Sequence, residues 1–347
     1  MFSSVSRILF ESTVRGIVSD LLSARAERQR YQVGRRFHRA IRRHLSGLER
    51  YPMHQVWSEF ALSTNLRGME LARTLQRYTE IRGKRYLDIG CAYGGYPIAF
   101  AAEGAEAVGI DINGRFLEFA ASNIKDQKTP VLLLERDVTK YDQICDLGGF
   151  DIITCNDLIE HVEDVARTVE HIGSLLRPGG LLYMQIPNGF SAGQVLKDGH
   201  YGLFGITLLS RPDAIRYFGE SGYNDDYGVG YFHRLDEYID LLATHRIRLH
   251  RGEIANSLER LKERITQIRA ALDPIRSRLS QCLDVSGLSL TTKRALADAV
   301  TGYLVQVSSD FEAYDATTDE GLKCRRARSL VKRYEIEFWE MIGVKSS

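Results

Sequence analysis

The stretch Tyr86-Leu-Asp-Ile-Gly-Cys-Ala-Tyr-Gly-Gly-Tyr-Pro97 decides the fold of this chain. It begins with a short apolar run, which is typical of a buried strand, and continues into a glycine-rich turn. Glycines let a backbone turn tightly and approach a ligand closely, because they carry no Cβ atom. A helix is predicted to begin near Tyr96, since Pro97 suits a first helical turn. The stretch therefore predicts a strand, a ligand loop and a helix N-terminus.

The spacing of the glycines indicates which kind of nucleotide the loop would bind. Loops for pyrophosphate cofactors follow G-x-G-x-x-G, which brings bare backbone N–H groups to the phosphates. Here the glycines stand at positions 90, 94 and 95, and Ala92 takes the middle position. The carboxylate of Asp88 also disfavours a pyrophosphate. The loop instead favours a cofactor that carries an amino-acid moiety with an ammonium group.

Further apolar runs follow at a regular spacing and end in acidic or polar residues. The predicted strands are 107–112, 131–137, 150–156 and 180–186. Asp111 lies twenty-one residues after Gly90, about the interval of one strand-helix-strand unit, where an acid hydrogen-bonds ribose hydroxyls. The ordered set predicts an α/β, Rossmann-like sheet with a ligand crevice at the strand ends.

With these motifs the chain resembles the class I S-adenosylmethionine-dependent methyltransferases, whose first motif has the form D-x-G-x-x-x-G. The resemblance covers roughly residues 85–250 and implies a seven-stranded methyltransferase sheet with helices on both faces, with S-adenosyl-L-methionine as the cofactor. It implies that Asp137 faces the adenine amino group and that Asn156 and Asp157 line the methionine part. The implied cofactor residues are Asp88, Gly90, Cys91, Ala92, Gly94, Asp111, Ile112, Asp137, Val138, Asn156 and Asp157.

Catalysis is predicted just after the fourth strand, where Glu160-His161-Val162 is similar to the Glu-His-Val of the ubiquinone-biosynthesis O-methyltransferases. Methyl transfer is an in-line displacement that depends chiefly on holding the acceptor in place. A hydroxyl acceptor also needs a base, and His161 is the first candidate because an imidazole titrates near ~6.5. The alternative is a structural histidine bonded to a backbone carbonyl. His200 and His233 are rival bases.

A divalent ion is an alternative use of the same segment. Asp157, Glu160 and His161 can share a helical face at positions i, i+3 and i+4, as proposed for ubiquinone-type relatives. One Asp, one Glu and one His recur often by chance, so we assign no metal site.

Composition favours a cytoplasmic enzyme. The chain has 347 residues and a net charge of +1, which gives no field to attract nucleic acid or an anionic membrane. Its five cysteines are odd in number and lack paired C-x-x-C spacing, as expected for reduced thiols. No apolar run approaches the ~18 residues of a membrane span, and residues 1–20 are amphipathic, which disfavours a secretory signal.

Three parts are predicted: an N-terminal helical extension over 1–80, a cofactor domain over 81–253 with a substrate cover at 190–231, and a helical insertion with the C-terminal segment over 254–347. Residues 25–43 carry eight arginines against one glutamate. They indicate either a patch for a phosphate-bearing substrate or a solvated helix face, and we favour the second.

The C-terminal part contains an apolar stripe over 254–283 that is compatible with a homodimer seam or with packing inside the chain. Pro274 is expected to interrupt this helix, with Asp273 capping a second one. Residues 334–344 alternate partly with period two, so they form either the last strand of the sheet or a terminal helix.

The leading hypothesis is an S-adenosylmethionine-dependent methyltransferase that acts on a small molecule or sugar, with oxygen as the favoured acceptor atom. Nucleic acid is disfavoured because interleaved stacking aromatics are missing from the sequence. One alternative is a nicotinamide-dependent oxidoreductase on a similar sheet, which the missing glycine at position 92 disfavours. Another is a non-catalytic binding protein that retains the nucleotide fold.

Overall fold

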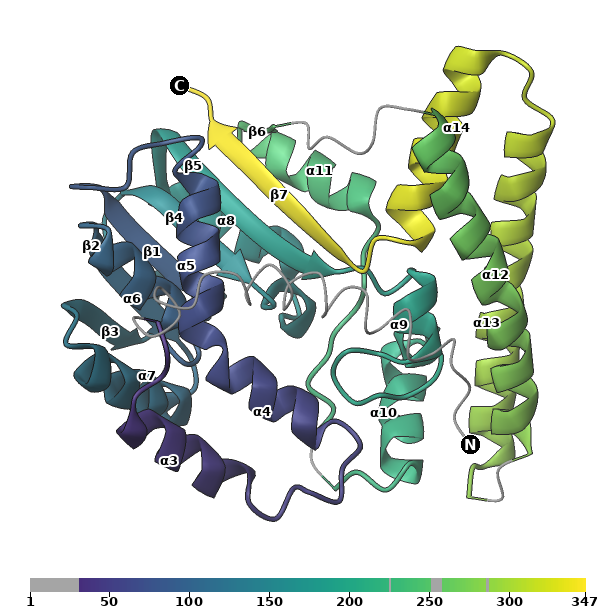
Figure 1. Ribbon diagram of the computed structural model, residues 1–347, viewed down its shortest axis with the longest axis horizontal. Helices are drawn as coiled ribbons and strands as arrows, with labels where there is room; N and C mark the ends of the chain where they lie inside the picture. Colours follow the sequence, from purple (N-terminus) through teal and green to yellow (C-terminus); the bar gives the residue numbers. More distant parts are fainter. Residues whose placement is uncertain (1–30, 225, 251–257, 285–286) are drawn as a thin grey trace.

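The computed structural model describes residues 31–224, 226–250, 258–284 and 287–347. A seven-stranded sheet flanked by helices lies beside a layer of long helices (Figure 1). The strand order is β3-β2-β1-β4-β5-β7-β6. In chain order the strands are β1 Arg85–Ile89, β2 Glu106–Asp111, β3 Val131–Glu135, β4 Phe150–Asn156, β5 Leu176–Pro187, β6 Ile247–Leu249 and β7 Phe338–Lys345.

The sheet confirms the predicted Rossmann-like architecture. Neighbouring strands from β3 to β5 pair in parallel, whereas β7 runs antiparallel to both β5 and β6. The strand predicted near 334–344 forms as β7, and the preceding helix ends at Tyr334, so the alternative of a terminal helix over that segment is wrong. The chain order reverses between β1 and β4, and α/β sheets bind ligands outside the strand ends at such a point.

Helices cover both faces of the sheet because its central strands are apolar on both sides. Leu87 and Ile89 of β1 join the core under α8 (Val165–Leu175) and α11 (Leu235–Thr244). Tyr86, pointing the other way, stacks on Phe100 with ring centroids 3.8 Å apart. That second face also carries α5 (Thr64–Leu75) and α6 (Gly95–Ala102), while α7 (Gly114–Gln127) connects β2 to β3.

The described part of the N-terminal extension is helical, with α3 (Arg35–Leu45), α4 (His54–Leu62) and α5. Phe37 and Ile41 of α3 pack in one cluster with Tyr93 of the glycine loop. The arginines of α3 are exposed on its opposite side, which matches the solvated face favoured above. Residues 1–30, including the first apolar positions and the start of the arginine-rich segment, lie outside the described residues.

The segment 190–231, predicted as a substrate cover, contains α9 (Ala192–Leu196), the 3₁₀ turn η3 (Ile206–Leu208) and α10 (Arg211–Glu220). Its aromatic side chains pack on one another. The ring of Phe218 lies 4.6 Å from the rings of both Tyr201 and Tyr223. These rings therefore build the core of the cover.

The C-terminal layer consists of α12 (Leu258–Leu283), α13 (Leu290–Asp315) and α14 (Glu320–Tyr334), shown in green to yellow in Figure 1. The apolar stripe of α12 is buried against α13, α14 and α9. Packing within the chain therefore accounts for the part of the stripe that the structure describes, while residues 254–257 lie outside the described residues. Among the described helices, none combines the length and the apolar character that crossing a bilayer requires.

The prediction that Pro274 interrupts this helix is wrong, because α12 continues through it. A proline inside a helix costs about 3 kcal/mol, since it removes one hydrogen bond and crowds the preceding turn. Leu272 and Ile275 flank it and are buried, and burying each such side chain contributes about 1.5–3 kcal/mol. Tertiary packing thus outweighs the local penalty, and Asp273 pairs with Arg276 instead of capping a new helix.

Candidate active site

The glycine loop between β1 and α6 adopts the tight backbone that its sequence predicts. Gly90 and Gly94 both have φ of +74°, in the left-handed region that glycine enters without strain. Ala92 also has a positive φ, of +41°. A non-glycine residue in this region stores strain of the kind found at ligand sites.

The loop amides are bonded within the protein. The N–H groups of Gly90 and Cys91 both donate to the carbonyl oxygen of Ile110, each at 2.9 Å, and that of Gly94 donates to Cys91 at 2.7 Å. The Ala92 N–H donates to Asp111 Oδ2 at 2.9 Å. A pyrophosphate would need such N–H groups, so the loop geometry supports the choice of a different cofactor.

The end of β2 presents one polar and one apolar side chain. Asp111 is nearly buried and also accepts from the N–H of Asn113 at 2.9 Å. Burial raises the pKa of Asp111, against the opposing effect of its backbone hydrogen bonds. The next side chain, Ile112, is 65% exposed, which places an apolar surface beside a carboxylate.

The end of β3 is arranged differently. Asp137 accepts hydrogen bonds from the N–H and hydroxyl of Thr139 and lies 3.3 Å from Lys140 Nζ. Burial opposes ionisation of Asp137, but these contacts outweigh it and lower its pKa. Val138 is buried, and its carbonyl contacts His171. The Asp137 carboxylate, at the position where the adenine is predicted to lie, is therefore hydrogen-bonded within its own turn.

Asp88, the second-last residue of β1, is a buried carboxylate, and one of its oxygens has no partner among the described residues. The Thr154 hydroxyl of β4 donates to its Oδ1 at 2.6 Å, and the Tyr86 hydroxyl lies 2.5 Å from the same Thr154 oxygen. Asp88 Oδ2 has no hydrogen-bond partner among the described residues. Burial raises the pKa of Asp88 to about 7.

Asn156 and Asp157 end β4 beside it. Neither polar atom of the buried Asn156 side chain has a hydrogen-bond partner within the described chain, and Asp157 Oδ1 also has none there. Asp157 has a φ of +49°. Burial and the charge of Glu160 raise the pKa of Asp157, against the opposing charges of Arg67 and His200.

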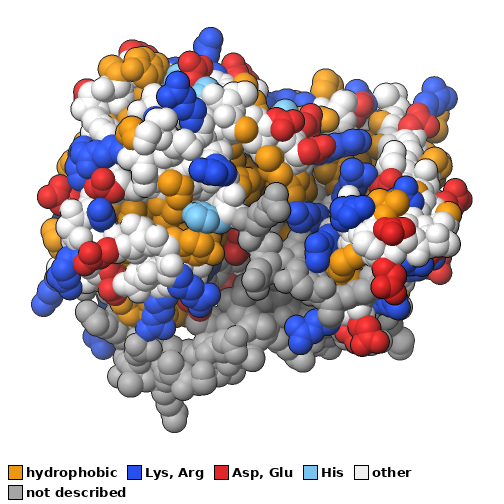
Figure 2. All heavy atoms as spheres, turned by 90° about the horizontal axis from the view of Figure 1, so that it is seen from above, with side chains coloured by type: hydrophobic (Ala, Val, Ile, Leu, Met, Phe, Trp, Pro, Cys, Tyr) orange, Lys and Arg blue, Asp and Glu red, His pale blue; other side chains and the backbone are white. Residues whose placement is uncertain are grey.

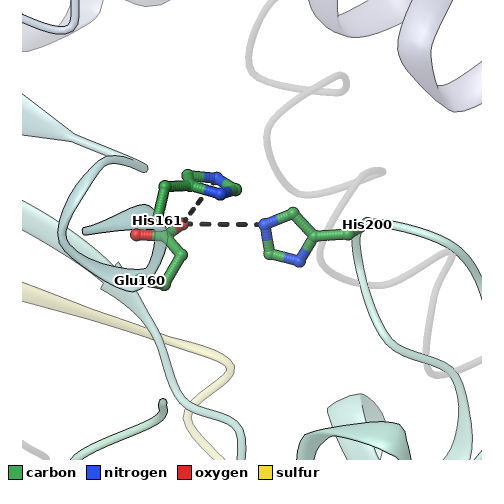
Figure 3. Close-up of side chains that lie close together, drawn as sticks. All are labelled: Glu160, His161 and His200. Atoms are coloured by element: carbon green, nitrogen blue, oxygen red, sulfur yellow. Dashed lines mark ion pairs between the residues drawn. The ribbon is translucent and has the colours of Figure 1, made fainter. Parts of the chain in front are cut away.

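Glu160 lies between two histidines, as Figure 3 shows. Its side chain is fully buried, and its Oε1 is 3.8 Å from His161 Nε2 and 3.7 Å from His200 Nε2. Burial lowers the pKa of His200, but contact with Glu160 and the charges of Glu160 and Asp198 outweigh burial and raise it overall. The geometry favours an imidazolium at His200 facing a buried carboxylate.

His161 is held through one ring nitrogen. Its Nδ1 lies 2.7 Å from the carbonyl oxygen of Gly228. A carbonyl only accepts hydrogen bonds, so Nδ1 carries a proton and the neutral ring keeps its lone pair on Nε2. The carbonyl contact expected of a structural histidine thus also sets the tautomer that a base requires. His233 instead lies 3.7 Å from Glu237 in α11.

One group of side chains within the described residues can hold a metal ion. Glu160, His161 and His200 each offer one ligand atom, all within 4.8 Å of one another. The predicted helical face with Asp157 does not form, because residues Ile159–His161 make a single 3₁₀ turn. His200 from the cover takes the third position, which spacing along the chain does not indicate.

Arg67 is a site residue that the sequence did not reveal. Its guanidinium lies 3.6 Å from the ring centroid of Phe60 and donates to the Tyr96 hydroxyl at 3.3 Å. Its charge opposes the rise in pKa of both Asp88 and Asp157. A single arginine in a helix outside any motif carries no sequence signal, so only the packing of α5 against α6 identifies it.

These residues fit a polar ligand with a positive charge. Buried polar atoms in proteins are normally hydrogen-bonded. Here Asp88 Oδ2, Asp157 Oδ1 and the Asn156 amide have no partners among the described residues, and all lie at or next to the ends of β1 and β4, where the strand order reverses. They offer carboxylate and amide groups to a ligand in that crevice.

Comparisons with known proteins agree on one family. A family model described as "Methyltransferase domain" matches residues 65–244. The chain is 31% identical over 114 residues to a ubiquinone biosynthesis O-methyltransferase of Coxiella burnetii (strain Dugway 5J108-111), covering 33% of this chain and 48% of the relative. It is 34% identical over 138 residues to the ubiquinone biosynthesis O-methyltransferase of Aromatoleum aromaticum, and this match covers 39% of this chain and 58% of the relative. The chain thus spans about half the length of the curated relatives it matches.

Solved structures include similar chains. The magnesium protoporphyrin IX methyltransferase of Synechocystis PCC 6803, solved with bound SAH, is 16% identical with a TM-score of 0.41. The match covers 58% of this chain and 81% of that chain.

Proposed function

Because this chain belongs to the methyltransferase-domain family through residues 65–244, we propose that it transfers a methyl group from S-adenosyl-L-methionine to an oxygen of a small-molecule acceptor. The observation that carries the proposal is the set of unpartnered polar atoms of Asp88, Asn156 and Asp157 at the ends of β1 and β4. The names of the relatives, ubiquinone biosynthesis O-methyltransferases, support oxygen as the acceptor atom.

The cofactor would supply an electrophilic methyl group on a sulfonium. Asp88, Asn156 and Asp157 would hold its methionine part, because their free oxygens suit an ammonium and a sulfonium charge. Asp111 would accept hydrogen bonds from the ribose hydroxyls. Ile112, Asp137 and Val138 would surround the adenine, and the backbone of the loop from Gly90 to Gly94 would pass beneath the nucleoside.

His161 would remove the proton from an acceptor hydroxyl. Its Nδ1–H is fixed by the Gly228 carbonyl, so Nε2 is the nitrogen that can accept this proton. His200 faces Glu160, whose carboxylate raises the pKa of His200, so His200 is the less suitable proton acceptor of the two. Together these contacts would orient the acceptor and make His161 the imidazole that serves as the base.

The acceptor class and the compartment also belong to this proposal. The polar side chains around Glu160 suit a phenol or a sugar hydroxyl, so we include both classes.

All five cysteines lie within the described ranges and are unpaired. Free thiols agree with a reducing compartment such as the cytoplasm.

The experiment is a calorimetric titration of the full chain with S-adenosylhomocysteine and, in parallel, with NAD⁺. We expect the first to bind and the second not to bind. Incubation with labelled S-adenosylmethionine and a panel of catechols, phenols and sugars then tests turnover. Binding of NAD⁺ alone would contradict the proposal in favour of an oxidoreductase, and cofactor binding without turnover on the panel would favour a binding protein.

A further inference from the structure

A second cavity lies apart from the site described above. It has a volume of about 680 Å³ and is bounded by residues of α11, α13 and α14. The described residues that line it include none of the predicted cofactor residues and none of the Glu160, His161 and His200 cluster. Ligand pockets commonly measure about 300–1,000 Å³, so the cavity is large enough for a small organic molecule.

The cavity is strongly basic. Five Lys or Arg side chains line it, against the single carboxylate of Asp236. Arg333 is already paired with Asp310 at 2.7 Å. Arg234, Arg325 and Lys332 form no ion pair within the described part of the chain. Figure 2 shows several Lys and Arg side chains on the side of the helical layer that faces the sheet.

The remaining lining is largely apolar. Phe190, Leu208, Ile239 and Trp339 contribute carbon surface from the cover, α11 and β7. Residues at the start of α11 also line the cavity, and a helix N-terminus carries a partial positive charge. The cavity thus combines an apolar body with unpaired positive charge.

We propose that this cavity binds an amphiphilic anion, an apolar chain or ring that carries a phosphate or carboxylate. The apolar walls would take the body of the ligand, and Arg325 and Lys332 would pair with its head group. Charge-assisted hydrogen bonds of this kind are about twice as strong as neutral ones. The proposal is independent of methyl transfer, because the two sites share no residues.

Two substitutions test the cavity without disturbing the fold. Gly302 lies in α13 on the cavity lining, and a Cβ added there meets open space. Gly302→Leu therefore fills the cavity and should favour the helix, since glycine is a poor helix residue. Lys332→Gln removes a charge. The matched controls are Gly219→Leu, at a glycine of α10 that also faces open space, and Arg77→Gln on an exposed surface.

The probes are octyl phosphate, octanoate, octanol and inorganic phosphate, titrated calorimetrically into the full chain. We expect octyl phosphate or octanoate to bind at least about tenfold more tightly than octanol or inorganic phosphate. Whichever anion binds more tightly identifies the head group. Gly302→Leu and Lys332→Gln should each weaken this binding about tenfold or more, and the two controls should not change it.

Three results would overturn the proposal. These are an absence of anion binding by the unsubstituted chain, equal binding of octanol, or unchanged binding in both cavity variants. Circular dichroism melting of each variant establishes that it is folded. Titration with S-adenosylhomocysteine should be identical in all of them, so failure of this proposal remains distinguishable from failure of the methyltransferase assignment.

Discussion

Replacing Asp88 by asparagine should stabilise the fold and weaken cofactor binding at the same time. Asp88 is 1% exposed, and burial raises its pKa from 3.8 to about 7. Asparagine is nearly isosteric and still offers an oxygen to the Thr154 hydroxyl, which donates to Asp88 at 2.6 Å. The substitution therefore removes a buried charge and keeps the hydrogen bond.

The size of the effect follows from the pKa shift and depends on pH. Because the folded state raises the pKa of Asp88, it binds this proton more tightly than the unfolded chain does, and ionisation destabilises the fold. The cost is absent below about pH 4, grows as pH rises, and is complete above about pH 7. At about 1.4 kcal/mol per unit, it reaches about 4 kcal/mol at pH 8 and about 2 kcal/mol at pH 5.

Urea unfolding of the two proteins at pH 5 and pH 8 measures this difference. We expect Asp88→Asn to raise the free energy of unfolding at both pH values, and more at pH 8. The control is Asp146→Asn, since that side chain is 65% exposed and should change stability by less than about 0.5 kcal/mol. A gain of the same size at both pH values, or no gain at pH 8, would refute a buried ionised Asp88.

The same variant tests the cofactor role of Asp88. An amide lacks the charge that we propose faces the cofactor, so affinity for S-adenosylmethionine should fall by about tenfold or more. In the unsubstituted protein, affinity should decline about tenfold per unit as pH falls below about 7, because Asp88 takes up a proton there. Calorimetry at several pH values measures both effects, and pH-independent affinity would assign Asp88 a purely structural role.

Four further outcomes are expected. Asp111→Ala should weaken S-adenosylhomocysteine binding by ~1–3 kcal/mol in calorimetry, because the ribose loses a charged acceptor; unchanged affinity would place the ribose elsewhere. His161→Ala should lower turnover by ~10² or more with cofactor affinity intact, and equal turnover would move the base to the cover. Pro274→Ala should raise the free energy of unfolding by about 1–3 kcal/mol in urea, because it restores an N–H inside α12; a loss of stability would mean that the ring itself packs. Dialysis against EDTA should leave methyl transfer unchanged, whereas activity lost and then restored by a divalent ion would make Glu160, His161 and His200 a metal site.

The strand ends of this protein are predictable because their signal is local. An apolar run followed directly by Asp88, Asp111 or Asn156 identifies both the strand and the polar residue at its end. The parallel order then brings those ends to one edge. The last strand has a weaker signal, because the partial period-two alternation of residues 334–344 fits either a strand or a terminal helix, and the structure forms β7 there.

Residues from outside the motifs are not predictable in this way. Arg67 has no sequence signal, and His200 is predicted only as a rival base, without its position beside Glu160. Each lies far along the chain from the groups it faces. At Pro274 a local rule gives the wrong prediction. Proline normally ends a helix, but here the burial of the neighbouring side chains outweighs that preference and α12 continues. Both depend on tertiary packing, which periodicity does not encode.

The choice of base rests on how charge is divided around Glu160. Two imidazoles face its buried Oε1 at 3.7 and 3.8 Å, but they differ at their other nitrogens. His200 directs its Nδ1 toward Asp198, at 3.9 Å, so a second carboxylate helps to hold its proton. His161 directs its Nδ1 toward the uncharged carbonyl of Gly228, so no second carboxylate faces its other nitrogen. A positive His200 also discourages a second positive charge 5.1 Å away, between ring centroids, so His161 remains the imidazole able to accept a proton.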